Sequence, residues 1–568
     1  MNQADTSPTS GAPAGTPMIK PQNGIAGLRH WRHDLVAGLI VSIVSLPLSL
    51  GIAVASGAPP ITGVVSAIIA GLIFPLIGGS YVTISGPAAG LAPALLAGMT
   101  ILGGGDLAKG YPLLLVAIFL AGCVQVVLSL AKAARFAAIF PTAVVEGMLA
   151  SIGLLIIIKQ LPQIYGVKFE AHEFFEYLVE APRRVAEIHG ENLGIALACL
   201  VLLFAFAGKI GAKLPLIRRL PPQLTVVVIG VLLGIAFGLD PKYLVPIPDD
   251  ILKNGMQVPH FGEVFTNHDL WLPVLGVVIT LTLIDGVESL ATAAAIDKID
   301  PFKRRSEPNR TLLAMALSNM ASSLIGGLTI IPGGVKSKVN IVAGGRTLWA
   351  NFSNAIFLIL FLSVAKDAIR LIPLPALAAV LIFTGWKMCE PKVWRHMAHS
   401  GREELLVFSL TILATLLTDL LWGIVIGTLI QLFVDAYFTA RTVGSHRGEE
   451  SSVGEVLGLL PKMLGRMCAS PIGRTELDGT DFHVHLNGPL VCFNTLKVSR
   501  ALDQVPAEAK RVVFHFSDQV SIVDHTTCDN LAALVEERAA SGRGTLELDG
   551  FDAMRRTADG ETSMRVAA

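Results

Sequence analysis

The stretch Ile84-Ser85-Gly86-Pro87-Ala88-Ala89-Gly90 interrupts one long apolar region of the chain, and Ile330-Ile331-Pro332-Gly333-Gly334-Val335-Lys336 interrupts another. Within a bilayer, a break in helical backbone is tolerated only where protein buries it or where it lines a wet cavity. Two interrupted apolar segments in matching places of two halves indicate the binding site of a transporter. The two breaks therefore predict both the class of fold and the place of the site.

The composition is that of a polytopic membrane protein. Of the 568 residues, 52% are hydrophobic and 15% are charged, whereas soluble domains carry about 25% charged residues. The formal net charge of +0 gives no overall case for binding nucleic acid. The six cysteines have neither CxxC nor metal-ligand spacing. The sequence contains no phosphate-binding glycine loop and no nucleophile–histidine–acid set, so we expect no enzyme activity.

Apolar stretches of about 20 residues, enough to cross a bilayer as a helix, recur along the chain. We expect full spans to begin near Asp34, Ile61, Leu113, Val144, Leu193, Leu224, Leu272, Leu312, Leu348, Leu374, Leu405 and Leu421. With the interrupted segments near Ser85 and Gly333, this makes about 14 segments in two sets of seven. Because seven is odd, the second set would insert upside down, so the fold would consist of two inverted seven-segment repeats.

Basic residues gather in loops that this threading places on one side of the membrane. These loops are 132–135, 209–219, 298–310 and 387–402, whereas the opposite loops, 159–192 and 239–269, carry fewer basic residues and many acids. An excess of Lys and Arg marks the cytoplasmic side. The sequence thus predicts a multi-pass protein of the inner cell membrane with both termini in the cytoplasm.

The pattern divides the chain into regions of different character. We expect a disordered cytoplasmic tail at 1–27, a transmembrane domain at 28–441 and a polar linker at 442–478. Residues 479–556 show alternating strands at 482–486, 511–516 and 544–548, separated by helical patterns at 494–504 and 524–540. This order is typical of a small sheet covered by helices. Residues 557–568 are expected to form a loose tail.

Several ordered motifs resemble those of a known family. They are Asp34-Leu35-Val36-Ala37-Gly38, Ser45-Leu46-Pro47, Gly57-Ala58-Pro59-Pro60, Gly78-Gly79-Ser80, Ser85-Gly86-Pro87 and Ala343-Gly344-Gly345-Arg346-Thr347. In this order they resemble the sulfate permease (SulP) family, which includes prestin, pendrin and a cyanobacterial bicarbonate transporter. The carboxy-terminal part resembles the cytoplasmic STAS domain of that family. The resemblance covers roughly residues 28–555.

The resemblance implies secondary active transport of a small anion, bicarbonate first and sulfate next, coupled to sodium or protons. It implies a core subdomain of segments one to four and eight to eleven, which would move in an elevator-like manner against a gate of the remaining six. It also implies a homodimer. The alternatives are dicarboxylate/proton symport, an anion channel, or a membrane scaffold that acts through a soluble partner of its STAS domain.

The anion would bind between two helix starts. A helix amino terminus presents free N–H groups and about half a positive charge, and a lone lysine at membrane depth is functional by default. Lys336 matches the place where prestin-like relatives have an arginine. The expected substrate-binding residues are Ser49, Gly86, Pro87, Ala88, Ala89, Gly333, Gly334, Val335 and Lys336. Ordinary helix kinks, and a structural Lys336 paired with a membrane carboxylate, are the alternatives.

The eighth segment supplies candidates for the coupled cation. Asp285, Glu288 and Thr292 follow one another at spacings of three and four residues, which places them on one helical face. Glu288 and Thr292 match the place where the bicarbonate transporter resembles a sodium site. They predict either a sodium site or a proton carrier, and no other cofactor is expected. The alternative is that Glu288 only pairs with Lys336.

Thr526 is a candidate phosphorylation site. The sequence Asp524-His525-Thr526-Thr527 resembles the loop that carries a phosphorylatable residue in other STAS domains. Phosphorylation at a helix start is physically reasonable. The alternative is a plain helix cap formed by Asp524 or Thr526.

Overall fold

The computed structural model describes residues 20–134, 140–171, 173–207, 222–247, 257–418, 420–445, 462–463, 465–467, 469–503, 505–506, 508–517, 519–541 and 544–567. Some predicted features lie outside these residues. They are most of the amino-terminal tail, the basic residues Arg135, Lys209, Lys213, Arg218 and Arg219, and linker residues 446–461.

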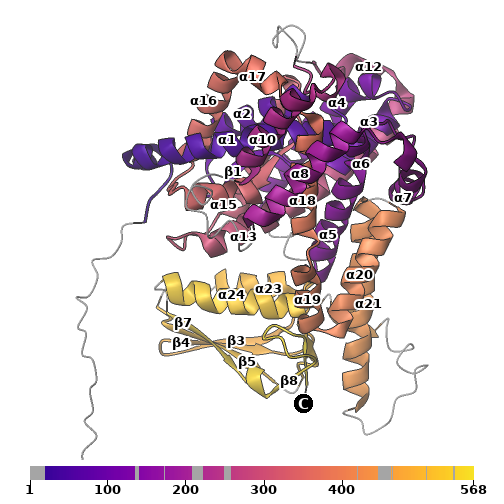
Figure 1. Cartoon of the computed structure of the whole chain (residues 1–568). Coiled ribbons are helices and arrows are strands. Elements are labelled where there is room, and N and C mark those ends of the chain that lie inside the picture. Colours follow the sequence, from indigo (N-terminus) through magenta and orange to yellow (C-terminus); the bar gives the residue numbers. More distant parts are fainter. Residues whose placement is uncertain are drawn as a thin grey trace, which may run out of the picture.

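Helices make up the amino-terminal part of the chain (Figure 1). The longer ones are α1 (Trp31–Ala55), α2 (Pro60–Ile77), α3 (Ala92–Leu102), α4 (Leu107–Leu130), α5 (Thr142–Lys159), α8 (Gly190–Ala207), α10 (Pro222–Phe237), α13 (Trp271–Ile299), α14 (Pro308–Leu324), α15 (Gly334–Val342), α16 (Trp349–Val364), α18 (Leu374–Met388), α20 (Arg402–Leu417) and α21 (Leu420–Ser445). Shorter ones are α6 (Leu161–Tyr165), α7 (Phe174–Arg183), α12 (Phe261–Thr266), α17 (Lys366–Arg370) and α19 (Pro391–Ser400). A helix begins close to each predicted full span, and the largest difference is between Leu113 and the observed start at Leu107.

Six helices within the described ranges are long and apolar enough to cross a membrane. They are Gly24–Ala55, Pro60–Ile77, Leu107–Leu130, Thr142–Tyr165, His268–Asp297 and Leu420–Thr442. Further apolar helices, among them α8, α10 and α16, are shorter. These lengths are those expected of a polytopic membrane protein.

Each predicted break begins with a short extended segment. Strand β1 (Ile84–Pro87) pairs with strand β2 (Ile330–Gly333) in antiparallel orientation, with Ser85 opposite Pro332. The two breaks therefore lie side by side, although 246 residues separate Ile84 from Ile330 in the sequence. Pro332 lies near a helix start, since α15 begins two residues later at Gly334. Pro87 and Pro332 belong to the strands, and α3 begins only at Ala92.

The helices pack in two groups. In the first group, α1 packs on α2 and α16, and α4 packs on α13 and α14. In the second, α5 packs on α18 and α20, and α8 packs on α10 and α18. Small residues allow the close approaches. A Cβ on Gly38 of α1 would collide with Ser353 of α16, as expected where helix backbones approach closely in a membrane.

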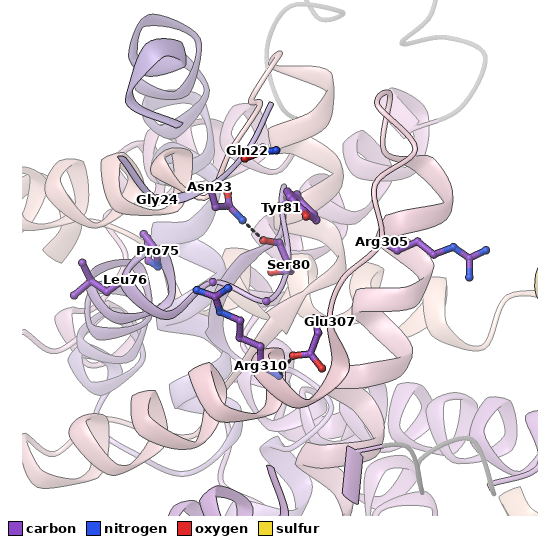
Figure 2. A pocket seen from close by; sticks show the side chains of 12 residues that line it. Gln22, Asn23, Gly24, Pro75, Leu76, Ser80, Tyr81, Arg305, Glu307 and Arg310 are labelled. Atoms are coloured by element: carbon purple, nitrogen blue, oxygen red, sulfur yellow. Dashed lines mark hydrogen bonds between the residues drawn. The ribbon is translucent and has the colours of Figure 1, made fainter. Parts of the chain in front are cut away.

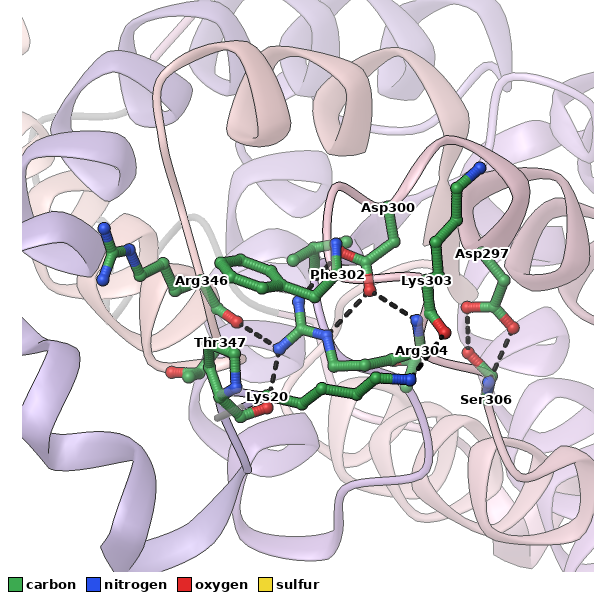
Figure 3. A network of polar contacts seen from close by, with 12 residues as sticks. Lys20, Asp297, Asp300, Phe302, Lys303, Arg304, Ser306, Arg346 and Thr347 are labelled. Atoms are coloured by element: carbon green, nitrogen blue, oxygen red, sulfur yellow. Dashed lines mark hydrogen bonds and ion pairs between the residues drawn. The ribbon is translucent and has the colours of Figure 1, made fainter. Parts of the chain in front are cut away.

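A buried ion pair ties distant parts of the first group together (Figure 3). Arg304 Nε lies 2.7 Å from Asp300 Oδ2, and the two side chains are 3% and 1% exposed. Arg304 Nη1 also donates to the carbonyl oxygens of Pro21 (2.8 Å) and Arg346 (2.7 Å). One guanidinium therefore holds the segment before α1, the loop between α13 and α14, and the turn before α16.

Arg304→Ala is expected to lower the thermal stability of the purified protein. The change leaves Asp300 buried without its counter-ion, and breaking such a pair costs about 3–5 kcal/mol. Thermal unfolding in detergent measures the effect. Arg304→Lys should recover part of the loss, because it keeps the charge but not the planar fork. An unchanged unfolding temperature in Arg304→Ala would show that the pair adds no stability.

The carboxy-terminal part forms an α/β domain. Its sheet has the order β3 (Ile472–Asp478), β4 (Asp481–Leu486), β5 (Arg511–Phe516) and β7 (Thr545–Asp549). The β4–β5 and β5–β7 pairs are parallel, and β3–β4 is antiparallel. Helices α23 (Thr495–Asp503) and α24 (His525–Ser541) lie between this sheet and the helical part (Figure 1).

The boundaries of the α/β domain differ from the predicted ones. Strand β3 lies inside the predicted linker at 442–478, because Ile472–Asp478 pairs with β4 along its length. The predicted loose tail at 557–568 is also wrong over the described residues 557–567. Strand β9 (Arg565–Val566) pairs with β6 (Ile522–Val523) and β8 (Arg555–Arg556), and Met564 is fully buried. Residues 557–567 form defined structure because residues of this segment, such as Met564, are buried against the rest of the α/β domain.

Several hydrogen bonds join the α/β domain to the helical part. The Thr142 amide donates to Thr526 Oγ1 (2.9 Å) at the start of α24. The Gly560 amide donates to the His399 carbonyl at the end of α19 (3.0 Å). Arg305 donates to the carbonyl of Ala533 in α24 (3.0 Å). The carboxy-terminal domain therefore contacts the loops before α5 and α14 and the end of α19.

Candidate functional site

A cavity of about 330 Å³ is lined from both helical groups. Its lining comprises Leu48, Ile52, Pro87, Ala88, Ala89, Gly90, Glu146, Leu149, Glu288, Thr292, Ile331, Pro332, Gly333, Gly334, Val335, Lys336, Lys338, Thr384, Lys387, Met388 and Val393. The two breaks thus meet in one cavity. It brings together the predicted substrate-binding residues of both breaks apart from Gly86.

The amino terminus of α15 faces this cavity. The first three residues of the helix, Gly334, Val335 and Lys336, all line it. Gly333 is the N-cap and has no side chain to satisfy the free N–H groups of the first turn. This end of the helix therefore presents unsatisfied donors and a partial positive charge to the cavity.

Lys336 lines the site and has no hydrogen-bond partner among the described residues. Its side chain is 1% exposed, and its Nζ makes no hydrogen bond to any described residue. A Cβ on Gly86 would collide with Nζ, so the ammonium group lies directly against the backbone of the first break. A buried ammonium without a counter-charge is costly, and an anion in the cavity would supply one.

Gly86→Ala is expected to weaken anion binding without unfolding the protein. The added methyl group would displace the end of the Lys336 side chain, and overpacking of this kind costs about 1–3 kcal/mol. We therefore expect affinity to fall by roughly tenfold, measured as anion-dependent thermal stabilisation. Gly276→Ala in α13 is the matched control, because no described atom lies within 4 Å of its added Cβ. Equal losses in both variants would contradict the prediction.

Glu288 and Thr292 line the cavity from α13. A Cβ on Gly90 would collide with the carboxylate of Glu288, which therefore lies against the backbone after the first break. Glu288 is 8% exposed, and its Oε2 has no hydrogen-bond partner. The alternative that Glu288 pairs with Lys336 is wrong in this structure, since Lys336 Nζ lacks any partner among the described residues.

Most of the helical part matches a known protein family. Residues 31–411 match the Sulfate permease family. The chain belongs to the sulfate permease family. It is therefore a multi-pass transmembrane anion transporter, as the ordered motifs around the two breaks indicate.

Two relatives show how far the sulfate permease match extends. The chain is 26% identical over 405 residues to "Putative sulfate transporter YvdB" of Bacillus subtilis (strain 168), covering 71% of this chain and 73% of the relative. It is 25% identical over 521 residues to "Bicarbonate transporter BicA" of Synechocystis sp. (strain ATCC 27184 / PCC 6803 / Kazusa), covering 91% of this chain and 87% of the relative. Because it covers 91% of this chain, the second match extends into the α/β domain.

Two solved transporter structures share the fold. The transmembrane domain of a cyanobacterium bicarbonate transporter BicA superposes with a TM-score of 0.62 at 24% identity, covering 70% of this chain and 98% of that one. Murine Slc26a9 in the inward-facing state also has a TM-score of 0.62, at 15% identity, covering 91% of this chain and 84% of that one.

Three predicted site residues do not line the cavity. Ser49 is fully buried, its Oγ has no hydrogen-bond partner, and its carbonyl oxygen lies against Gly63 of α2. Its neighbour Leu48 lines the cavity instead. Gly86 lies against Lys336 Nζ but does not itself line the cavity. The third residue that does not line the cavity is Asp285.

Asp285 belongs to a separate buried network. Its Oδ2 accepts hydrogen bonds from Gln125 (3.4 Å) in α4 and Asn319 (3.1 Å) in α14. Asn319 in turn accepts from the Ile330 amide (2.6 Å) at the start of β2. The three-residue spacing placed Asp285 and Glu288 on one side of α13, but the neighbouring helices hold Asp285 away from the cavity. Its polar contacts support β2.

The cavity also contains polar residues that the sequence did not single out for the site. Glu146 lines it from α5, Lys338 from α15 and Lys387 from the end of α18. Lys387 forms an ion pair with Glu390 (3.0 Å). Glu146 could have been predicted from the sequence as a site residue, because an ionisable residue inside an apolar span is a functional candidate by default. The sequence pattern of Lys387 is that of a loop residue.

Thr526 lies at the contact between the two parts of the chain. It is 7% exposed, and its Oγ1 accepts the hydrogen bond from the Thr142 amide. Asp524 provides the helix cap, because its Oδ1 accepts from the Thr527 amide (2.7 Å). Phosphorylation of Thr526 stays a prediction, and it would require the domain to move away from α5.

A second cavity, of about 380 Å³, lies between the segment before α1, the end of α2 and the start of α14 (Figure 2). Arg305, Glu307 and Arg310 line it. Glu307 caps α14, since its carboxylate accepts from the Arg310 amide. Arg310 also donates to the Ile77 carbonyl. Glu307 and Arg310 are thus engaged in local structure, and Arg305 donates to Ala533 in α24. None of the predicted site residues lies here.

Proposed function

We propose that this sulfate permease is a secondary active transporter of a small anion that binds in the cavity between β1, β2 and α15. The observation that carries the proposal is the unpartnered, 1% exposed Lys336 beside the start of α15. The free N–H groups of α15 and the ammonium group together favour negative charge.

Bicarbonate is the favoured substrate and sulfate the next. The one buried lysine of the lining, Lys336, can balance the charge of one monoanion. Glu288 adds a carboxyl group to the same cavity. This balance favours a monoanion over a dianion, because a second negative charge would remain unpaired in a desolvated site. Leu48, Ile52 and Ala88 form an apolar wall, which also suits a weakly hydrated, small anion. The similarity to a protein named bicarbonate transporter over 91% of the chain agrees with this choice.

Glu288 and Thr292 are the proposed coupling residues. A carboxylate and a hydroxyl one helical turn apart could supply oxygen ligands to a sodium ion as a co-transported substrate. The carboxyl group alone could carry a proton. Asp285, engaged with Gln125 and Asn319, would have a supporting role.

We infer an elevator-like mechanism in which the first helical group moves against the second. The group of α1–α4 and α13–α16 would be the core, and the group of α5, α8, α10, α18, α20 and α21 the gate. The antiparallel pairing of β1 with β2 agrees with two inverted seven-segment repeats, since inversion would bring equivalent breaks together in opposite directions.

The α/β domain would be a cytoplasmic STAS domain, with both termini in the cytoplasm and the protein in the cell membrane as a homodimer. The cavity reaches Lys387 and Val393, next to α19, which contacts the α/β domain through His399. With that domain in the cytoplasm, the cavity would face inward.

Uptake into proteoliposomes tests the proposal. Purified protein would be reconstituted and supplied with labelled bicarbonate, sulfate or a dicarboxylate, each with and without sodium and pH gradients. Gradient-dependent accumulation of one anion supports secondary active transport. Uptake that only follows the electrochemical gradient of the anion would instead indicate a channel. No uptake of any anion would favour a scaffold that acts through its STAS domain.

A further inference from the structure

A buried cluster of metal-binding side chains lies where the α/β domain meets the helical part. Asp435 belongs to α21, whereas Cys492 follows β4 and Asp524 precedes α24. One ligand atom from each of the three residues lies within 4.8 Å of the other two. All three residues are fully buried. Groups from both parts of the chain therefore converge on one point.

Hydrogen bonds orient these groups and still leave ligand positions free. Asp524 accepts from the Thr527 amide at Oδ1 (2.7 Å) and from the Cys492 amide at Oδ2 (2.6 Å). Asp435 Oδ1 accepts from Gln431 Nε2 (2.9 Å), but Asp435 Oδ2 has no partner. Each carboxylate oxygen has two lone pairs, so both aspartates retain capacity for a further ligand.

Glu404 provides a second, independent observation. It lies on α20, is 1% exposed, and neither of its carboxylate oxygens has a hydrogen-bond partner among the described residues. Helix α20 packs on α21, which carries Asp435. Glu404 is thus a further buried carboxylate on a helix next to the cluster.

The cluster lacks a permanent counter-charge. Within the described part of the chain, no lysine or arginine forms an ion pair with Asp435, Glu404 or Asp524, and the ion pair of His525 Nε2 is with Asp529 (3.7 Å). Burying several carboxylates without compensation costs several kcal/mol per ion. Either bound protons or a bound cation must therefore neutralise them.

We propose that Asp435, Cys492 and Asp524 bind a zinc-class divalent cation that joins the α/β domain to α21. Sulfur favours zinc over magnesium or calcium, which prefer oxygen ligands alone. Bond lengths of about 2.0–2.3 Å place the ligand atoms of a tetrahedral zinc site about 3.3–3.8 Å apart. This separation fits within the observed 4.8 Å.

Metal stoichiometry of the purified full chain tests the site. Protein treated with a chelator, loaded with zinc and desalted should retain about one zinc per chain, measured by mass spectrometry of the metal. Cys492→Ser and Asp435→Asn should each lower zinc affinity at least about tenfold. The matched control is Cys528→Ser, which should keep its zinc. Cys528 is a buried cysteine of the same domain whose Sγ contacts the carbonyls of Val523 and Ser563.

Cobalt loading gives a readout that does not depend on a variant being stable. Wild-type protein and Cys528→Ser should acquire a thiolate-to-cobalt charge-transfer absorption, and folded Cys492→Ser should not. Absence of stoichiometric zinc and of this absorption in the wild type would overturn the proposal. Equal zinc binding by Cys492→Ser would also overturn it. So would chelated protein that zinc does not stabilise but that gains thermal stability as the pH falls, because protons would then neutralise the cluster.

Discussion

Lys336→Ala is expected to remove anion binding and transport while the protein stays folded. The Lys336 ammonium lines the cavity without a hydrogen-bond partner among the described residues, and it lies against Gly86 of β1. Truncating one partner of a buried charge pair costs about 2–5 kcal/mol, which corresponds to at least roughly a 30-fold loss of affinity. Without an anion bound, the truncated protein loses only an uncompensated charge, so its stability should be unchanged or higher.

The measurement combines anion-dependent thermal stabilisation with uptake into proteoliposomes. Lys338→Ala is the matched control, since Lys338 lies two residues further along the same helix, lines the same cavity and is exposed. We expect Lys338→Ala to change affinity less than tenfold, as is usual for exposed charges. If Lys336→Ala retains wild-type affinity and uptake, Lys336 is structural and the anion binds elsewhere.

Glu288→Gln is expected to abolish gradient-driven accumulation while anion binding persists. The variant keeps the size of the side chain that lies against Gly90, but it can neither carry a proton nor supply a charged ligand to sodium. Accumulation against a gradient should fall to the level of passive exchange. Anion affinity should be unchanged or higher, because a negative charge leaves the cavity.

Two further variants test whether sodium or a proton is the coupled ion and whether the effect is specific to Glu288. Thr292→Val removes a hydroxyl ligand, so it should impair sodium-driven uptake but leave proton-driven uptake intact. Asp285→Asn is the control for Glu288, since Asp285 is bound to Gln125 and Asn319 outside the cavity lining. It should lower stability more than coupling. Gradient-driven accumulation by Glu288→Gln at the wild-type level would show that another group carries the coupled cation.

Much of the helical architecture was predictable because the bilayer restricts it. Long apolar runs must form helices in lipid, so α2 begins at Pro60 and α18 at Leu374, within one residue of their predicted starts. The same restriction made the breaks at 84–90 and 330–336 conspicuous. Strands of the α/β domain were also predictable, because Phe482, Val484 and Leu486 alternate with polar residues and are buried.

Side-chain direction within a helix was less predictable. Spacings of three and four residues suggested that Asp285, Glu288 and Thr292 act together, but a helical face is broad. Gln125 and Asn319 on neighbouring helices draw Asp285 away from the cavity. For the same reason, Leu48 lines the cavity but its neighbour Ser49 does not. The two-residue strand β9 has too short a pattern to be detected, so 557–567 appeared to be a tail.

The sequence by itself determined that this is a membrane transporter fold, and it singled out Lys336 as a candidate site residue, because charge and backbone breaks are rare and costly in an apolar chain. Only the tertiary structure decided which polar groups meet. It pairs β1 with β2 across 246 residues and leaves Lys336 without a partner. It also brings Asp435 together with Cys492 and Asp524. Such encounters depend on how separate helices and domains pack, and no local pattern of residues encodes that packing.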